Sequence, residues 1–353
     1  MKTAQKFFAL VLCLLISNVQ LFAWDSLGHM AVAYVAYQHL NPAAKGRVDA
    51  LLKLNPDYHK WLAQIPQGTS AANKKMMAFM IAATWPDQIK SEQGYTDDGT
   101  QGGNRPDGTT SVQNIGYTDH LHHKYWHFVD TPFSTDGATL PAIPTPNAGT
   151  QIAVFRSVLA STDPDEKKSY DLVWLEHLVG DVHQPLHAAT RVSSTDPNGD
   201  NGGNNVKLCA PPCRDELHAF WDDVLGTSSS PSTAISVGKA LPDADSALAA
   251  KKDAADWIKE SFDAAQQSVY VAPIAAGDGP FTITPSYRTA AKKLAEQRIA
   301  LAGVRLANLL NEEPTGRSSL KRIARPSRFM EALLSQVTKC TTHAEAQNAP
   351  QHG

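Results

Sequence analysis

The sequence predicts an all-α fold. Apolar residues recur at the spacing of a helix through most of the chain, and the strict alternation typical of strands is scarce. Proline and asparagine stand where several of these periodic segments end, and such residues are helix stop signals. The same pattern leaves no obvious linker in the middle of the chain, which favours one large domain.

Eight helices are expected in order. They cover residues 30–40, 46–54, 74–83, 151–159, 169–182, 215–225, 246–269 and 287–310. The first two end at Asn-Pro pairs, and the third ends before Trp85-Pro86. Three long loops separate the helices, over 94–113, 131–150 and 191–213. Loops of this length in a compact domain are often functional, and Gly202 and Gly203 in the third would permit close approach of the backbone to a ligand.

Residues 1–23 predict a secretory signal peptide. Lys2 and Lys6 form a charged start, a short apolar run covers 7–16, and Ala23 suits the position before a cleavage site. An uncleaved membrane anchor is the alternative, which the shortness of the apolar run disfavours. Cleavage would export the protein, secreted or periplasmic, with Trp24 as its first residue. We expect one domain over 24–311, not embedded in a membrane, and a basic tail over 312–353.

The composition argues against a protein that binds nucleic acid through net positive charge alone. The formal net charge is −3, from 32 basic and 35 acidic residues, so the chain is unlike a basic DNA-binding protein. Three residues separate Cys209 from Cys213, and an oxidising compartment would permit a small disulfide there. A zinc-ligand pair is the rival interpretation of these two cysteines. Cys340 is left without an assigned role.

The stretch 177–187 carries the strongest functional signal. It holds three histidines and Asp181 among apolar residues, and His177 and Asp181 share one helix face at a spacing of four. His218 and Asp222 repeat that spacing, while Asp87 and His127 stand beside aromatic residues. Each motif alone also fits a core histidine or a surface helix pair. Their recurrence favours a divalent metal, and this ligand type favours zinc. Spacing alone does not choose between His183 and His187.

The candidate ligands and the short sequence motifs around them resemble those of a known protein family. The matching stretches are 85–87, 127–130, 177–187, 202–204 and 217–222, together with the tryptophan at the mature start. They are similar to the zinc-dependent single-strand-specific nucleases, typified by the fungal P-one and S-one type enzymes and plant bifunctional nucleases, within the phospholipase C/P-one nuclease superfamily. The resemblance covers about 24–311 and implies a multi-helix domain with three zinc ions in a cleft. The ligands it implies are Trp24, His29, Asp87, His127, His177, Asp181, His187, His218 and Asp222.

The resemblance distributes these ligands among three zinc ions. It assigns Asp87, His127 and His177 to the first, with Asp181 bridging to the second. The second is held by His29 and by the amine and carbonyl of Trp24. The third takes His187, His218 and Asp222, so the family pattern chooses His187 over His183.

The resemblance also implies the reaction. A water shared by two zinc ions at Asp181 would become a hydroxide near neutral pH and attack the phosphorus of a phosphodiester. Asp181, Lys90 and Asp130 are the implied catalytic residues, and Lys90 stands where some relatives carry arginine. Phe128 would stack on an unpaired base, Asp130 would hydrogen-bond its edge, and Lys90 and Asn204 are assigned to the substrate as well. The implied substrates are single-stranded DNA and RNA, cut to 5′-phosphate products, and 3′-nucleotides. A monomer without a stable protein partner is expected.

Two other functions stay open from the sequence. A zinc-dependent phospholipase C uses a similar site, but the short spacing from Trp24 to His29 and the last ligand, Asp222, favour the nuclease. A non-enzymatic exported zinc-binding protein would need neither a stacking aromatic residue nor an open coordination position. Turnover separates it from the enzymes.

Overall fold

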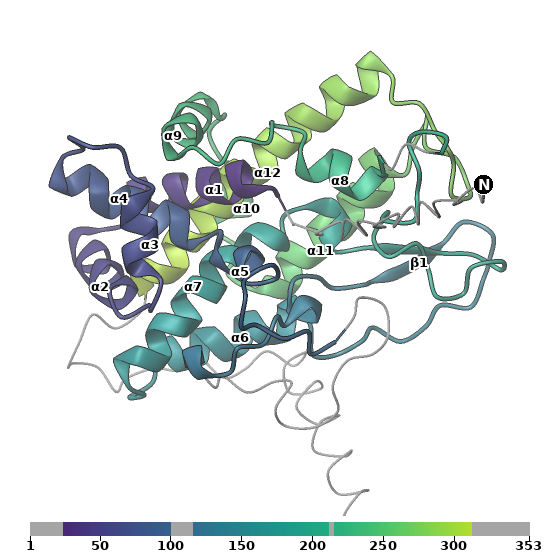
Figure 1. Cartoon of the computed structure of the whole chain (residues 1–353). Helices are drawn as coiled ribbons and strands as arrows, with labels where there is room; N and C mark the ends of the chain where they lie inside the picture. The colour runs from purple at the N-terminus through teal and green to yellow at the C-terminus, as the bar shows by residue number, and fades with distance from the viewer. Residues whose placement is uncertain (1–23, 100–115, 212–214, 313–353) are drawn as a thin grey trace, which may run out of the picture. The chain divides into compact units, whose positions relative to one another are not determined.

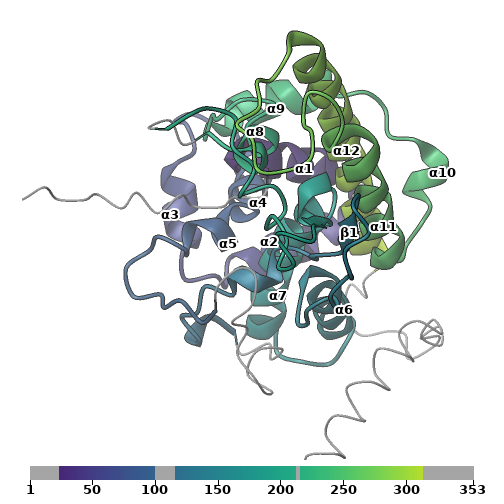
Figure 2. The ribbon, with the colours of Figure 1, turned by 90° about the vertical axis from the view of Figure 1, so that its right-hand side faces the viewer.

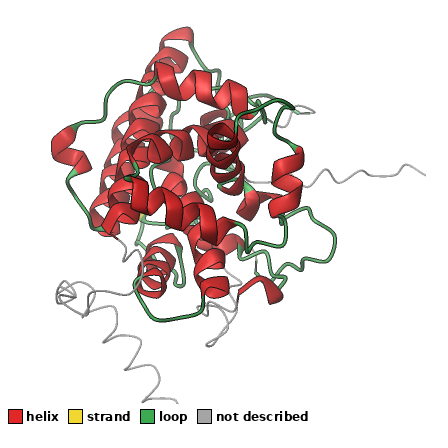
Figure 3. Ribbon diagram, turned by 90° about the vertical axis from the view of Figure 1, so that its left-hand side faces the viewer, coloured by secondary structure: helices red, strands yellow, loops and turns green. Residues whose placement is uncertain are grey.

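Helices and loops make up nearly all of the described chain, which confirms the predicted all-α class (Figures 1 and 3). The computed structural model describes residues 24–99, 116–211 and 215–312. The predicted signal peptide, Cys213 and almost all of the predicted tail lie outside these residues, so the predictions made for them stay predictions. None of the described helices combines the length and the apolar character needed to cross a membrane.

Twelve α-helices are found among the described residues, with four shorter helical segments between them. The α-helices are α1 (Ser26–His39), α2 (Pro42–Leu52), α3 (Tyr58–Ala63), α4 (Ala71–Ala82), α5 (Trp85–Gln88), α6 (Ala148–Leu159), α7 (Asp165–Asp181), α8 (Leu217–Asp222), α9 (Pro231–Ala240), α10 (Ser246–Ala249), α11 (Ala254–Ala264) and α12 (Pro285–Glu312). The short segments are η2 (Gly116–Thr118), η3 (Lys124–Trp126), η4 (Pro185–His187) and the π-helix η5 (Ala265–Val269). Helices α3, α5 and α9 were not predicted from the sequence.

Capping side chains explain why several helices begin earlier than the apolar pattern predicts. Asp25 accepts hydrogen bonds from the amides of Leu27 and Gly28, so α1 begins at Ser26 and not at residue 30. Asn41 caps α2 in the same way, with Pro42 in the first turn. These residues satisfy amides that have no partner inside a helix. An Asn-Pro pair interpreted as the end of one helix is therefore also the start of the next.

The predicted helix over 246–269 is wrong, because the chain breaks between α10 and α11. The carbonyl of Leu248 accepts hydrogen bonds from Arg305, and the carbonyl of Lys251 accepts one from the indole of Trp257. Side-chain donors thus replace the helical amides. Asp253 then caps α11.

Two helices form the centre of the fold. Helix α1 packs against α4, α7, α9 and α12, and α7 packs against α6 along its length (Figures 1 and 2). Every residue of α7 from Lys168 to Asp181 is buried. Helices α1 and α12 approach closely at Gly303, where a β-carbon would lie 2.5 Å from that of Val35. Polar side chains near the ends of α1 and α7 are therefore enclosed by the core.

A two-stranded parallel sheet lies within segments that the sequence assigned to loops. Strand β1 (Pro132–Ser134) pairs with β2 (Thr190–Val192). The pairing extends toward the site, because the amide of Val129 donates a 2.7 Å hydrogen bond to the carbonyl of His187. The sheet thus holds the segment that carries His127 beside the one that carries His187.

Candidate metal centre

Three groups of buried histidine and aspartate side chains converge in the structure. Each group offers ligand atoms that all lie within 4.8 Å of one another. The residues come from α1, α5, the turn after η3, the C-terminal end of α7, η4 and α8. The groups are His29, His177 and Asp181; Asp87, His127 and His177; and His187, His218 and Asp222.

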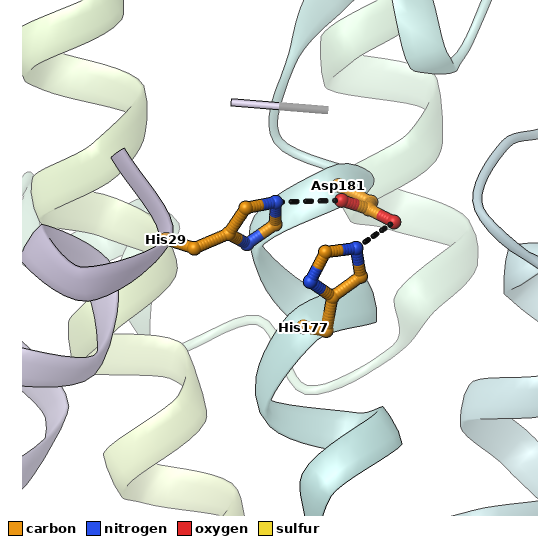
Figure 4. Close-up of side chains that lie close together, drawn as sticks. All are labelled: His29, His177 and Asp181. Carbon is orange, nitrogen blue, oxygen red and sulfur yellow. Dashed lines mark ion pairs between the residues drawn. The ribbon is translucent and has the colours of Figure 1, made fainter. Parts of the chain in front are cut away.

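Asp181 faces two sets of histidines at once, and Figure 4 shows one histidine of each set, His29 and His177. Its Oδ1 lies 3.3 Å from Nε2 of His29. Its Oδ2 lies 3.3 Å from Nε2 of His177 and 3.1 Å from Nδ1 of His127. A carboxylate shared by two cations must direct one oxygen toward each of them. Asp181 directs one oxygen toward each set of histidines. The spacing of four on α7 places His177 and Asp181 together, as the sequence predicts.

Asp87 turns its two oxygens in a similar way. Oδ2 lies 3.9 Å from Nε2 of His29, and Oδ1 lies 3.6 Å from Nε2 of His177 and 3.7 Å from Nδ1 of His127. Lys90, one turn further along the chain, places its Nζ 2.7 Å from Oδ1. Lys90 therefore lies beside the centre.

The third group is built from η4 and α8. Nε2 of His187 lies 3.0 Å from Nε2 of His218, which in turn lies 3.5 Å from Oδ2 of Asp222. Gln184 donates a 2.7 Å hydrogen bond to the other oxygen of Asp222. Gln184 was missed by the sequence reasoning, although its place between His183 and His187 was a signal.

Backbone carbonyls orient three of the imidazole rings. Nδ1 of His177 donates to the carbonyl of Ala83 at 2.7 Å, and Nδ1 of His187 donates to that of His127 at 2.8 Å. Nδ1 of His218 donates to the carbonyl of Gly202 at 2.7 Å. Because the proton sits on Nδ1, the lone pair of Nε2 points into the centre. Such outer hydrogen bonds are typical of metal-binding histidines.

Burial disfavours the charged form of most side chains in the three groups. It lowers the pKa of His29, His127, His177 and His187 well below the ordinary value, and lowers the pKa of His218 to about 4. Burial also raises the pKa of Asp181 and Asp222 well above the ordinary value. Neutral imidazoles at physiological pH can bind a metal without first losing a proton.

Both the spacing of the donors and their lack of partners fit a metal. Two ligand atoms bound to a tetrahedral zinc at 2.0–2.1 Å lie about 3.3 Å apart. The facing ligand atoms of the three groups, including Nε2 of His177 and Nδ1 of His127 at 2.9 Å, are separated by 2.9–3.9 Å. Among the described residues, both ring nitrogens of His29, Oδ2 of Asp87 and Oδ1 of Asp181 are buried and make no hydrogen bond. Buried polar atoms of this kind are costly unless a ligand satisfies them.

Trp24 lies beside the candidate metal centre. Its indole donates a 3.2 Å hydrogen bond to the carbonyl of Gly180, and the next amide, of Asp25, donates to the carbonyl of Asp222. The first residue of the predicted mature chain is thereby held between α7 and α8. Whether its amine and carbonyl bind a metal stays a prediction, because it depends on cleavage after Ala23.

Three of the predicted substrate residues line a small pocket beside the third group, whereas Lys90 is not among the residues that line it. Phe128, Asp130 and Asn204 share this pocket with Leu186, Asn201, Gly202 and His218. Phe128 is largely buried, with its side chain at the pocket wall. The structure therefore brings these three residues together with a candidate metal ligand, and their contacts with substrate stay predictions.

His183 points away from the centre. Its Nδ1 donates to the carbonyl of Val179, and its Nε2 lies 2.9 Å from the guanidinium of Arg305 on α12. Among the described residues it belongs to none of the three candidate groups. Spacing could not decide this, because the chain leaves the helical path after Asp181.

Comparison with known proteins agrees with this geometry. The sequence model of the S1/P1 nuclease family matches residues 24–313. The chain belongs to the S1/P1 nuclease family. Nuclease S1 from Aspergillus oryzae is 24% identical over 317 residues, which cover 82% of this chain and 91% of that protein. Endonuclease 3 from Arabidopsis thaliana is 25% identical over 327 residues, covering 85% of this chain and 92% of the relative. The three groups therefore lie within a nuclease domain.

Proposed function

We propose that this nuclease is an exported, zinc-dependent endonuclease that cuts single-stranded DNA and RNA to 5′-phosphate products and also removes the phosphate of 3′-nucleotides. One observation carries the proposal: Asp87 and Asp181 each direct one oxygen toward His29 and the other toward His127 and His177. Two carboxylates shared in this way suit a pair of metal ions, and the third group suits one more.

The donor set favours zinc. Imidazole nitrogens and single carboxylate oxygens at tetrahedral spacing are typical zinc ligands, whereas magnesium and calcium prefer shells of oxygen. The ligands would be His29, Asp87, His127, His177 and Asp181 for the pair, with Trp24 joining after cleavage, and His187, His218 and Asp222 for the third ion. Bound zinc supplies Lewis acidity, which produces a nucleophile from water near neutral pH and polarises a phosphate.

The protein's own residues position the phosphodiester. Lys90 would neutralise part of the charge on the phosphate and so favour attack on phosphorus. The oxygen of water adds to phosphorus, the bond from phosphorus to the 3′-oxygen breaks, and that oxygen leaves as a hydroxyl. The phosphate therefore stays on the 5′-oxygen of the downstream fragment, and the upstream fragment ends in a 3′-hydroxyl.

The pocket supports a preference for unpaired bases. The ring of Phe128 offers a stacking surface, and Asp130 and Asn204 add polar groups at the same pocket. A base can enter such a pocket only after it leaves the duplex stack, while stacking itself accepts any base. We therefore expect single strands to be cut much faster than duplexes.

The test is turnover by mature protein on circular single-stranded DNA, with a matched circular duplex as comparison. We expect cleavage of the single strand to 5′-phosphate ends, loss of cleavage with a chelator, and recovery with zinc. RNA and a 3′-nucleotide are assayed in parallel. Hydrolysis of phosphatidylcholine without cleavage of DNA would move the activity to lipids, and the absence of any turnover would leave a zinc-binding protein.

A matched pair of histidine variants controls this experiment. His177→Ala removes a ligand shared by two groups and is expected to abolish cleavage. His59→Ala removes an exposed histidine of α3 and is expected to leave cleavage unchanged. Equal activity of the two variants would contradict the assignment of the centre.

A further inference from the structure

The turn over residues 199–204 has an unusual backbone. Gly199, Asn201, Gly202 and Gly203 all adopt positive φ, at 84°, 51°, 60° and 84°. A β-carbon on Gly202 would lie 2.6 Å from the carbonyl oxygen of Leu186, the residue before a candidate ligand. Three of these residues are glycines, which reach this backbone region without strain but lose more conformational freedom on folding than other residues, so the turn needs contacts that hold it in one conformation.

Asp200 supplies these contacts. Its Oδ1 accepts hydrogen bonds from the amides of Arg191 at 3.0 Å and Gly203 at 3.2 Å, and from the hydroxyl of Tyr270 at 3.1 Å. Its carbonyl accepts the amide of Asn205 at 3.1 Å. Asp200 is 2% exposed, so water does not compete for these bonds. One carboxylate thus ties the turn to β2 and to the residue after η5.

Arg191 fixes Asp200 from the opposite side. Its Nε lies 3.6 Å from Oδ2 of Asp200, and its guanidinium lies 4.8 Å from the ring centre of Tyr270. The same guanidinium donates to the carbonyls of Ala275 and Gly277, each at 2.6 Å. The side chain that balances the buried charge is therefore held by a third segment of the chain.

The held turn faces the site at two points. The carbonyl of Gly202 accepts a hydrogen bond from Nδ1 of His218, which directs Nε2 toward His187. Asn201, Gly202 and Asn204 form one wall of the pocket that Phe128 and His218 also line. Asp200 is not among the residues that line this pocket, so any effect it has on the site passes through the turn.

We propose that Asp200 is a positioning residue that sets both the orientation of His218 in the third metal group and the pocket wall formed by 201–204. The inference rests on the proposed zinc-dependent function. Asp200 differs from the metal ligands in this role, because it acts through the turn. Only the group of His187, His218 and Asp222 depends on that turn. Loss of Asp200 should therefore weaken one zinc and substrate binding together, while the Asp87–Asp181 pair keeps its metals.

The test compares zinc retention and kinetics in zinc-loaded mature protein. Wild type and Asp200→Ala are equilibrated against graded chelator, retained zinc is counted by elemental analysis, and KM and kcat are measured on a short single-stranded oligonucleotide. We expect Asp200→Ala to release one zinc at a free-zinc concentration about tenfold higher than wild type does. The other zinc ions should leave together at the wild-type concentration. KM should rise by a larger factor than kcat falls, since the pocket wall contributes to binding.

Three further variants separate positioning from general destabilisation. Asp200→Asn keeps the acceptor oxygen at Oδ1 and should restore most of the zinc retention and KM. Tyr270→Phe removes one of the hydrogen bonds to Oδ1 of Asp200 and should shift the same zinc by a smaller factor, which keeps the test usable if Asp200→Ala does not fold. Asp136→Ala removes a carboxylate that ties an exposed turn at Ser194 and should change neither zinc retention nor KM.

The proposal is overturned by either of two results. Wild-type zinc retention and KM in Asp200→Ala would show that the turn keeps its shape without the carboxylate. Parallel loss of all zinc ions, with no rescue by Asp200→Asn, would show a role in folding alone. The wild-type zinc count tests the proposed function, whereas the differences between variants test Asp200, so the two failures are distinguishable.

Discussion

Oδ1 of Asp181 lies 3.3 Å from Nε2 of His29, although the two residues belong to different helices and are 152 positions apart in the chain. The other oxygen of the same carboxylate faces His177 and His127. Asp181 is thus the side chain on which the two halves of the paired centre meet.

Asp181→Asn should abolish turnover and loosen two zinc ions together. The amide keeps the shape of the side chain but cannot offer an anionic oxygen to each half of the pair. We expect turnover to fall by about 1,000-fold or more, and zinc counting should show two ions lost. Asp222→Asn should loosen only one zinc. Retained turnover with three bound zinc ions in Asp181→Asn would exclude the shared role.

A methionine left before Trp24 should weaken one zinc. The free α-amine has a pKa of about 8 and can bind a metal, whereas a peptide nitrogen at the same place cannot. Mature protein that begins at Trp24 is the comparison, and zinc retention against chelator is the measurement. Equal retention in the two proteins would show that the amine is not a ligand.

Gly180→Ala should weaken the metal pair without a change at the third group. A β-carbon at residue 180 would lie 2.9 Å from Nδ1 of His29, so the imidazole would have to move away from Asp181. We expect about tenfold weaker retention of one zinc. Gly46→Ala in α2 is the matched control, because its β-carbon would meet nothing within 4 Å. That variant should gain about 0.5–1 kcal/mol of stability and keep its zinc. Unchanged retention in Gly180→Ala would contradict the prediction.

Asp171 on α7 should make stability depend on pH. Burial raises its pKa to about 9, from 3.8, and neither carboxylate oxygen forms a hydrogen bond. The folded state therefore keeps a proton that the unfolded state loses above pH 4. Between about pH 4 and pH 9 this group lowers the free energy of unfolding by about 1.4 kcal/mol for each pH unit.

Asp171→Asn removes that dependence. Thermal unfolding measured at pH 5 and pH 8 should show that the stability of the variant, relative to that of wild type, is greater at pH 8 than at pH 5. Asp136→Asn is the control. Hydrogen bonds from Ser134 and Ser194 lower the pKa of that exposed carboxyl, so folded and unfolded states are both ionised across this range. A difference between Asp171→Asn and wild type that stays constant with pH would refute the buried-proton explanation.

Local patterns in the sequence predicted most of the longer helices and part of the centre, but not α3, α5 and α9. The spacing of four places His177 with Asp181 and His218 with Asp222, because both pairs lie inside regular helices. Helix ends were less predictable. At Asn41 and Asp253 a side chain caps the helix that follows, and the break before α11 depends on Arg305, which is distant in sequence.

By itself, then, the sequence determined the helical class, the residue types for a zinc site and the resemblance to single-strand nucleases. Tertiary structure decided which of these residues meet. Spacing alone does not choose between His183 and His187 as a metal ligand. Helix α7 ends at Asp181, and the turn that follows places His183 beside Arg305 and His187 beside His218. Asp200 carries no such motif, and its importance lies in contacts with β2 and Tyr270. Periodicity records only neighbours along one helix, whereas a metal centre needs side chains from several segments, and only packing brings those together.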